Sequence, residues 1–187
     1  MSFFDPSTDP TLRQQILTYV ASELMTDSER ARLLGLPEGC RIRERAKIIC
    51  PERFQCGKQV WIGEGAILDA QGGLSVGDFT QIGLNVMVWS HTSHFQALRG
   101  ETGLSREDII YTPTSIGERC FIAGPSVIMP GVSIGNSVFI PPMSVVKESL
   151  PDGTVFQDDQ REISRLKLKI ENIERQVEQL LANNPRA

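Results

Sequence analysis

The strongest constraint in this sequence is a repeat of six residues. From residue 116 the chain divides into the blocks IGERCF, IAGPSV, IMPGVS, IGNSVF, IPPMSV and VKESLP. Neither the helical period of about 3.6 residues nor simple alternation explains this spacing. The repeat predicts a coil with three flat faces, in which each block supplies one short strand and one turn. An aliphatic residue opens each block, at Ile116, Ile122, Ile128, Ile134, Ile140 and Val146, and a small or apolar residue follows four places later, at Cys120, Ser126, Val132, Val138, Ser144 and Leu150.

The same spacing occurs earlier in the chain, at Ile62, Leu68, Val76, Ile82 and Val88. A slip of two residues lies within AQGGLS, where paired glycines suit a turn or a bulge. Glycine follows the opening aliphatic residue at 63, 77, 83, 117 and 135, where neighbouring backbones must come close. We therefore expect a mainly β fold, a parallel β-helix over residues 46–157. Eighteen residues would complete each rung, with the opening aliphatic side chains stacked inside.

A segment without the repeat interrupts the coil between Val88 and Ile116. It contains both histidines of the chain, His91 and His94, together with Arg99, Arg106 and Tyr111. A loop of this length inside a regular coil is usually functional or disordered. We expect a functional loop extruded over residues 91–114, although two solvated loop histidines would produce the same sequence.

Composition excludes several kinds of partner. The net charge is −4, the isoelectric point is about 5.3 and no basic run occurs, so we expect no nucleic-acid partner. No segment approaches the roughly 18 apolar residues of a membrane span, and the N-terminus lacks the pattern of a signal peptide. The four cysteines have no zinc or redox spacing. These features predict a cytoplasmic protein with reduced thiols, no membrane span and no bound metal.

The hexads, the AQGGLSVGD slip and the histidine-bearing loop resemble the hexapeptide-repeat acyltransferases. The resemblance is closest to the branch that O-acetylates sugars and polysaccharide precursors, and it covers roughly residues 46–157. It implies a left-handed β-helix, a homotrimer with active sites between subunits, and acetyl-CoA as the donor. It also implies that a loop histidine acts as general base toward a hydroxyl of a saccharide or small-molecule acceptor, without a covalent acyl-enzyme.

The family position favours His94 as that base. Counted from Val88, His91 is fourth in its hexad and His94 lies one place beyond the sixth. The family histidine usually occupies the sixth place, so His94 fits after an insertion of one residue. Phe95 also resembles the aromatic residue that is common after the family histidine. His91 would then bind the acceptor or orient the loop.

The donor and acceptor sites are predicted less directly. By resemblance, Gly124 and Pro142 would line the pantetheine arm, Lys147 would belong to the donor site and Arg161 would reach the CoA phosphates. Lys147 and Arg161 could equally be ordinary surface charges. Lys147 lies one position early, however, and the closing GNPA-type stretch of the family is absent. Asp69 suits either a contact with a sugar hydroxyl or a turn in which it caps its own backbone.

Other functions remain open from the residues alone. The same chemistry could act on an amino-sugar nitrogen or an antibiotic hydroxyl, or the chain could be a non-catalytic trimeric scaffold. A metal-dependent carbonic anhydrase on this coil needs three histidine ligands, and the chain has two histidines.

The two ends of the chain are predicted to be helical. In the N-terminal segment 1–45, one helix over 11–25 would place Leu12, Ile16, Val20 and Leu24 on one face, and TDSE at 26–29 is typical of a capping box that opens a second helix, ended by Gly35. In the segment 158–187, gaps of 3 and 4 residues alternate, which is a heptad pattern. It predicts either a trimeric coiled coil or a helix folded back on its own subunit. The heptad residues are Ile163, Leu166, Ile170, Ile173, Val177 and Leu180.

Overall fold

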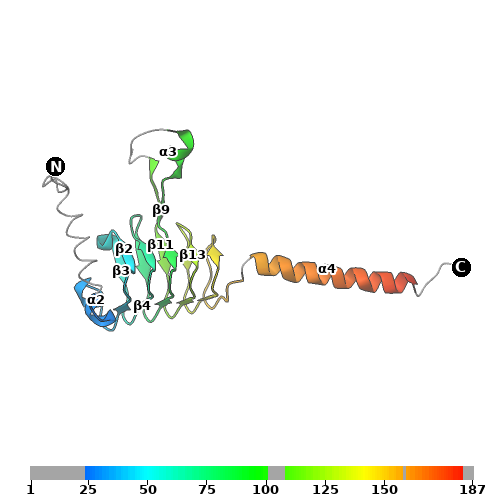
Figure 1. The fold of residues 1–187 in the computed structure, drawn as a ribbon, viewed down its shortest axis with the longest axis horizontal. Coiled ribbons are helices and arrows are strands. Elements are labelled where there is room, and N and C mark those ends of the chain that lie inside the picture. Colours follow the sequence, from blue (N-terminus) through cyan, green and yellow to red (C-terminus); the bar gives the residue numbers. More distant parts are fainter. Residues whose placement is uncertain (1–23, 101–107, 158, 183–187) are drawn as a thin grey trace. The chain divides into compact units, whose positions relative to one another are not determined.

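The computed structural model describes residues 24–100, 108–157 and 159–182. The strands among these residues form a parallel β-helix (Figure 1). Three sheets form its faces. Sheet A contains β1 (Arg41–Ile42), β4 (Trp61–Ile62), β7 (Gln81–Ile82), β12 (Phe121–Ile122) and β15 (Phe139–Ile140). Sheet B contains β2 (Lys47–Ile49), β5 (Ile67–Asp69), β8 (Met87–Val88), β13 (Val127–Ile128) and β16 (Val145–Val146). Sheet C contains β3 (Phe54–Cys56), β6 (Leu74–Val76), β11 (Thr114–Ile116) and β14 (Ser133–Ile134).

The inward stack predicted from the hexads is confirmed. Every opening aliphatic residue is buried, with at most 3% of its surface exposed, and each lies in register with its equivalent on the next rung. In sheet A, for example, Ile62, Ile82, Ile122 and Ile140 form one column. The glycine columns beside the stack are also explained, since a Cβ at Gly63 would lie 2.7 Å from the backbone of Gly83.

The rung length differs from the predicted eighteen in the first half of the coil. Trp61 pairs with Gln81, twenty positions on, whereas Phe121 pairs with Phe139, eighteen positions on. The additional residues lie at the corner between sheets B and C, which we call the B/C corner. There, the sequence slip gives an eight-position step from Leu68 to Val76, against six from Ile128 to Ile134.

The predicted loop leaves the coil at the same B/C corner. It begins as a two-residue antiparallel ladder between β9 (His91–Thr92) and β10 (Ile110–Tyr111), and α3 (His94–Arg99) follows β9. An ion pair joins Arg99 to Asp108, near the start of β10. In Figure 1 this extension, which we call the arm, stands out from the coil. The coil resumes at Thr114.

The N-terminal end of the coil is covered by α2 (Asp27–Leu33), which packs on β1. The predicted capping box is confirmed, because Thr26 and Glu29 exchange hydrogen bonds. Arg30 is buried and donates to the carbonyl of Ile42 over 2.6 Å. The coil starts at Arg41 rather than 46, and most of the helix predicted over 11–25 lies outside the described residues.

The C-terminal helix α4 (Asp159–Ala182) belongs to a compact unit of its own, Gln157–Ala187, separate from the unit that contains the coil. Across the described segments, none of the helices combines the length and the apolar character needed to cross a membrane.

Because Ile82 lies in the buried column and Gln81 is exposed, alanine substitutions at these adjacent residues should differ strongly in their effect on the free energy of unfolding. Ile82→Ala should lower the free energy of unfolding by about 2–5 kcal/mol, because it opens a cavity in a fully buried column. Its exposed neighbour on β7 supplies the control, since Gln81→Ala should change that free energy by less than about 0.5 kcal/mol. Urea unfolding at one fixed protein concentration measures both, and equal effects would contradict the inward assignment.

Candidate active site

Asp69 and His91 meet at the B/C corner, where the arm leaves the coil. Asp69 is the last residue of β5, and His91 begins β9 three positions after β8 ends at Val88. Because Leu68 pairs with Val88, the ends of these two strands lie side by side. The Nδ1 atom of His91 lies 2.6 Å from Oδ2 of Asp69.

The carboxylate of Asp69 is fully buried and held by several donors. Its Oδ2 accepts from the backbone N–H of Ser90 over 2.9 Å and from the Ser90 hydroxyl over 3.2 Å, and its Oδ1 accepts from the N–H of Gln71 over 3.0 Å. Burial by itself would raise the pKa of Asp69. The hydrogen bonds from Ser90, His91 and Gln71 outweigh burial and hold that pKa below its usual value, so the group is a carboxylate at neutral pH.

This carboxylate determines which nitrogen of His91 carries the proton. An ionised carboxylate can only accept hydrogen bonds, so Nδ1 of His91 must be the donor in their contact. In the neutral imidazole, Nε2 is then the atom with a free lone pair, as a general base requires. The side chain of His91 is 18% exposed, which leaves the ring partly accessible from solvent.

The local backbone is shaped to make this contact. Gly72 passes so close to Ser90 that a Cβ would overlap the Ser90 carbonyl oxygen, and its N–H donates to the Ser90 hydroxyl over 2.8 Å. The backbone N–H of Thr112 donates to the same carbonyl over 2.9 Å, and the Thr114 hydroxyl donates to the carbonyl of Trp89 over 2.6 Å. The paired glycines of the slip and the base of the arm therefore hold Ser90 and His91 together.

His94 lies in a different environment. It is exposed at the start of α3, its Nδ1 lies 2.6 Å from the hydroxyl of Thr92, and its ring centroid lies 4.1 Å from that of Phe95. A hydroxyl partner can donate as well as accept, so it does not select one tautomer as the Asp69 carboxylate does. The geometry thus favours His91 over the histidine that counting within the hexads favoured.

Two roles were predicted for Asp69, a backbone-capping turn and a contact with a sugar hydroxyl, and the structure treats them differently. The turn is confirmed, since Asp69 caps the N–H of Gln71 two residues on. Within this chain the side chain has no exposed surface with which to meet a sugar hydroxyl, and it contacts His91 instead. Ser90, which the sequence did not single out, is the second residue that fixes the carboxylate. A rung length of twenty, read from the slip, would have placed Asp69 beside the strand that leads into Ser90.

Within the coil, Gly124 and Pro142 lie at a different corner from Lys147. Gly124 and Pro142 lie at the corner between sheets A and B, at the other end of the sheet B strands from the B/C corner. A groove runs beside them, lined by Asn85, Met87, Pro125, Val127, Met143 and Val145. Lys147 is exposed directly after β16, at the B/C corner, and Arg161 belongs to α4.

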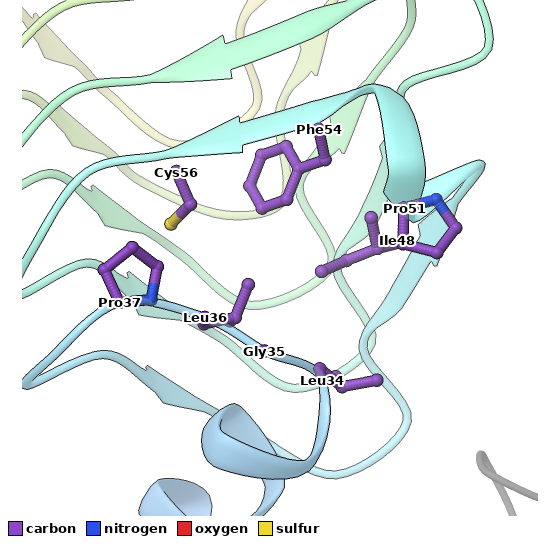
Figure 2. Close-up of a pocket in the computed structure, with 8 residues that line it drawn as sticks. All are labelled: Leu34, Gly35, Leu36, Pro37, Ile48, Pro51, Phe54 and Cys56. Carbon is purple, nitrogen blue, oxygen red and sulfur yellow. The ribbon is translucent and has the colours of Figure 1, made fainter.

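A second pocket lies at the first rung and has a different character (Figure 2). The side chains that line it are apolar or weakly polar, from Leu34, Leu36, Pro37, Ile48, Pro51, Phe54 and Cys56. Burial, followed by the nearby Cys40 thiol, raises the pKa of Cys56, so this thiol is a poor source of thiolate at neutral pH. The pocket therefore offers packing surface rather than acid–base or nucleophilic chemistry.

The described residues contain no group of three or more histidine, cysteine, aspartate or glutamate side chains placed to hold a metal ion. The contact between Asp69 and His91 can supply acid–base chemistry at the B/C corner.

Comparison with known proteins adds a sequence relative and several similar structures. The chain is 29% identical over 142 residues to the putative colanic acid biosynthesis acetyltransferase WcaF of Escherichia coli K12, covering 75% of this chain and 74% of the relative. No family model matches the sequence.

Two solved structures share the fold. A maltose O-acetyltransferase from Clostridium difficile 630 has a TM-score of 0.62 at 20% identity and covers 79% of this chain and 83% of its own. A hexapeptide-repeat acetyltransferase from Vibrio cholerae, solved with acetyl-CoA, has a TM-score of 0.59 at 21% identity and covers 80% and 84%. The described coil thus has the left-handed β-helix fold of these two acetyltransferases, and the sequence is similar to that of a putative acetyltransferase.

Proposed function

We propose that this protein is an acetyl-CoA-dependent O-acetyltransferase that acts on a hydroxyl of a sugar or of a cell-surface polysaccharide precursor. The observation that carries the proposal is the 2.6 Å contact between a buried carboxylate, Asp69, and a partly exposed imidazole, His91. The names of the relatives support the substrate class, since one is a putative colanic acid biosynthesis acetyltransferase and another is a maltose O-acetyltransferase. Use of acetyl-CoA implies action in the cytoplasm.

In this proposal His91 is the base and Asp69 is its positioning residue. As the acceptor oxygen attacks the thioester carbonyl carbon, its proton passes to Nε2 of His91. The Asp69 carboxylate stabilises the positive charge that the ring then carries. When the carbon–sulfur bond breaks, the imidazolium returns this proton to the departing thiolate. The acetyl ester and the free thiol are the products, and His91 is again neutral.

The outward faces of the coil support an assembly of three copies. Sheet B presents an apolar ladder outward, formed by Ile67, Met87, Val127 and Val145. Sheet A presents Phe121 and Phe139, with ring centroids 5.9 Å apart and each at least 40% exposed. The outward ladder of sheet C is polar and consists of Gln55, Ser75, Ser115 and Ser133.

An apolar face on sheet B and an aromatic patch on sheet A suit contacts with two different neighbours, and such contacts form a ring of three when the rotation between copies is one third of a turn. In a trimer of this kind, the groove beside Gly124 and Pro142 of one copy would approach the dyad of the next. The donor site would then form between subunits, which would explain why one chain does not gather its parts.

The first prediction separates the two histidines. His91→Ala should lower kcat by 100-fold or more, as expected for loss of a general base, while His94→Ala should lower it less than about 5-fold. The assay is release of the CoA thiol from acetyl-CoA with a panel of neutral sugars, amino sugars and hydroxyl antibiotics as acceptors. Reversed effects would transfer the base to His94, and activity confined to amino sugars would replace O-acetylation by N-acetylation.

The second prediction concerns the positioning role of Asp69. In Asp69→Asn the amide can donate to Nδ1, which would move the imidazole proton to Nε2 and remove the basic lone pair. We expect kcat to fall by about 100-fold or more with the KM for acetyl-CoA unchanged. A normal kcat in the folded variant would show that His91 needs no carboxylate.

The lowered pKa of Asp69 adds a dependence of stability on pH. The stability from this carboxylate is present above its unfolded-state pKa of about 3.9 and is lost as the pH falls through its lower folded-state value. Wild type should therefore exceed Asp69→Asn in stability at neutral pH, and the difference should shrink below pH about 4. Urea unfolding across this range measures it, and a constant difference would contradict the assignment.

A separate prediction tests the donor directly. Saturating acetyl-CoA should raise the thermal unfolding midpoint, with about 2.7 kcal/mol of stabilisation at 100 times the dissociation constant. ATP at the same concentration is the control for nonspecific nucleotide effects. An unchanged midpoint, with the assembly intact, would favour the non-catalytic scaffold.

A further inference from the structure

The helix α4 carries a continuous apolar stripe, and every side chain of this stripe is exposed. Within the described helix, the stripe consists of Ile163, Leu166, Ile170, Ile173, Val177 and Leu180, with exposed fractions of 48%, 49%, 54%, 58%, 47% and 69%. The helix has 24 residues and belongs to a unit distinct from the coil. A stripe of this length on a helix normally faces a partner.

We propose that α4 is an oligomerisation element, which forms a parallel three-stranded coiled coil with α4 from two further copies of this chain. The alternating gaps of 3 and 4 place Ile163, Ile170 and Val177 at heptad position a, and Leu166, Ile173 and Leu180 at position d. All of the a residues are β-branched. A seam with this regular period suits an identical helix with the same period.

Charges beside the seam favour a second copy in parallel register. Lys169 occupies a g position, and Glu174 occupies the e position five residues later. In a parallel, in-register coil these positions of neighbouring helices lie side by side, so each Lys169 would approach a Glu174 of the next copy. The charges on the outer face also alternate in sign, with Arg165, Glu171, Arg175 and Glu178, whereas a helix that lies on an anionic membrane carries mainly basic residues.

The middle of the seam favours three strands. Isoleucine at both a and d shifts coiled coils away from dimers, and Ile170 and Ile173 provide this combination at the centre. The flanking layers, Ile163 with Leu166 and Val177 with Leu180, combine a β-branched a residue with leucine at d, which by itself favours two strands. The three-stranded form therefore rests on the central layer and on the trimer of the coil proposed above.

The seam covers under three heptads, which is short for independent association. Its tethering to coils that pack on one another would raise the effective concentration of the three helices. The proposal of three strands thus rests partly on the trimer proposed above. The proposal that the stripe packs against an identical helix does not depend on that trimer.

A matched pair of substitutions in the full chain tests the proposal. Ile170→Lys places a charge in the seam, and Leu168→Lys places the same charge at the f position, on an apolar side chain that is 60% exposed. Sedimentation equilibrium over a dilution series gives the mass and the concentration at which the assembly dissociates. We expect a trimer for wild type and Leu168→Lys, and dissociation at a concentration at least 10-fold higher for Ile170→Lys. The circular dichroism at 222 nm should fall in the dissociated variant.

Each other outcome overturns a stated part of the proposal. Equal dissociation of the two variants would exclude the seam. Loss of thermal stability in Ile170→Lys without any change in dissociation would indicate a helix folded back on its own subunit. A wild-type dimer would overturn the three-stranded form. Because neither substitution touches Asp69 or His91, acetyl transfer measured at high protein concentration remains an independent test of the proposed activity.

Discussion

The structure depends on one packing constraint, the stacking of inward aliphatic side chains from rung to rung. The aliphatic residues that open the hexads have at most 3% of their surface exposed, and each lies over its equivalent on the next rung. Together they form one core cluster that continues from rung to rung along the coil. The stack tolerates little change in position, because glycine columns beside it bring backbones within van der Waals contact. Variation must therefore occur at the corners.

Variation in turn length is found at the B/C corner. Its first two turns accept two additional residues, and the third accepts the whole arm without disturbing the register of the strands on either side. The dyad forms at this corner because a lengthened turn supplies Asp69 and the departing arm supplies His91. A rigid stack thus positions a site made of irregular backbone, which is the common arrangement in proteins whose loops carry the chemistry.

The electrostatics of the dyad follow from unequal burial. Asp69 has no exposed surface, yet hydrogen bonds from Ser90, Gln71 and His91 keep it charged. His91 retains an accessible edge, so the buried charge acts on a ring that an acceptor could reach. His94 has the greater access but a hydroxyl neighbour, which cannot stabilise an imidazolium as a carboxylate does. The more exposed of the two histidines is therefore the one without a carboxylate partner.

The sequence by itself determined the coil, its inward residues, the interruption that carries both histidines and the capping box at Thr26. These features are periodic or local, so their spacing along the chain carries the information. Only the tertiary structure decided that Asp69 meets His91, a contact between residues 22 positions apart on neighbouring rungs. That contact depends on a rung of twenty rather than eighteen residues and on the close approach of Gly72 to Ser90. The hexad repeat encodes neither this rung length nor this close approach, because it describes the strands on the faces of the coil, whereas Asp69 and His91 meet at a corner.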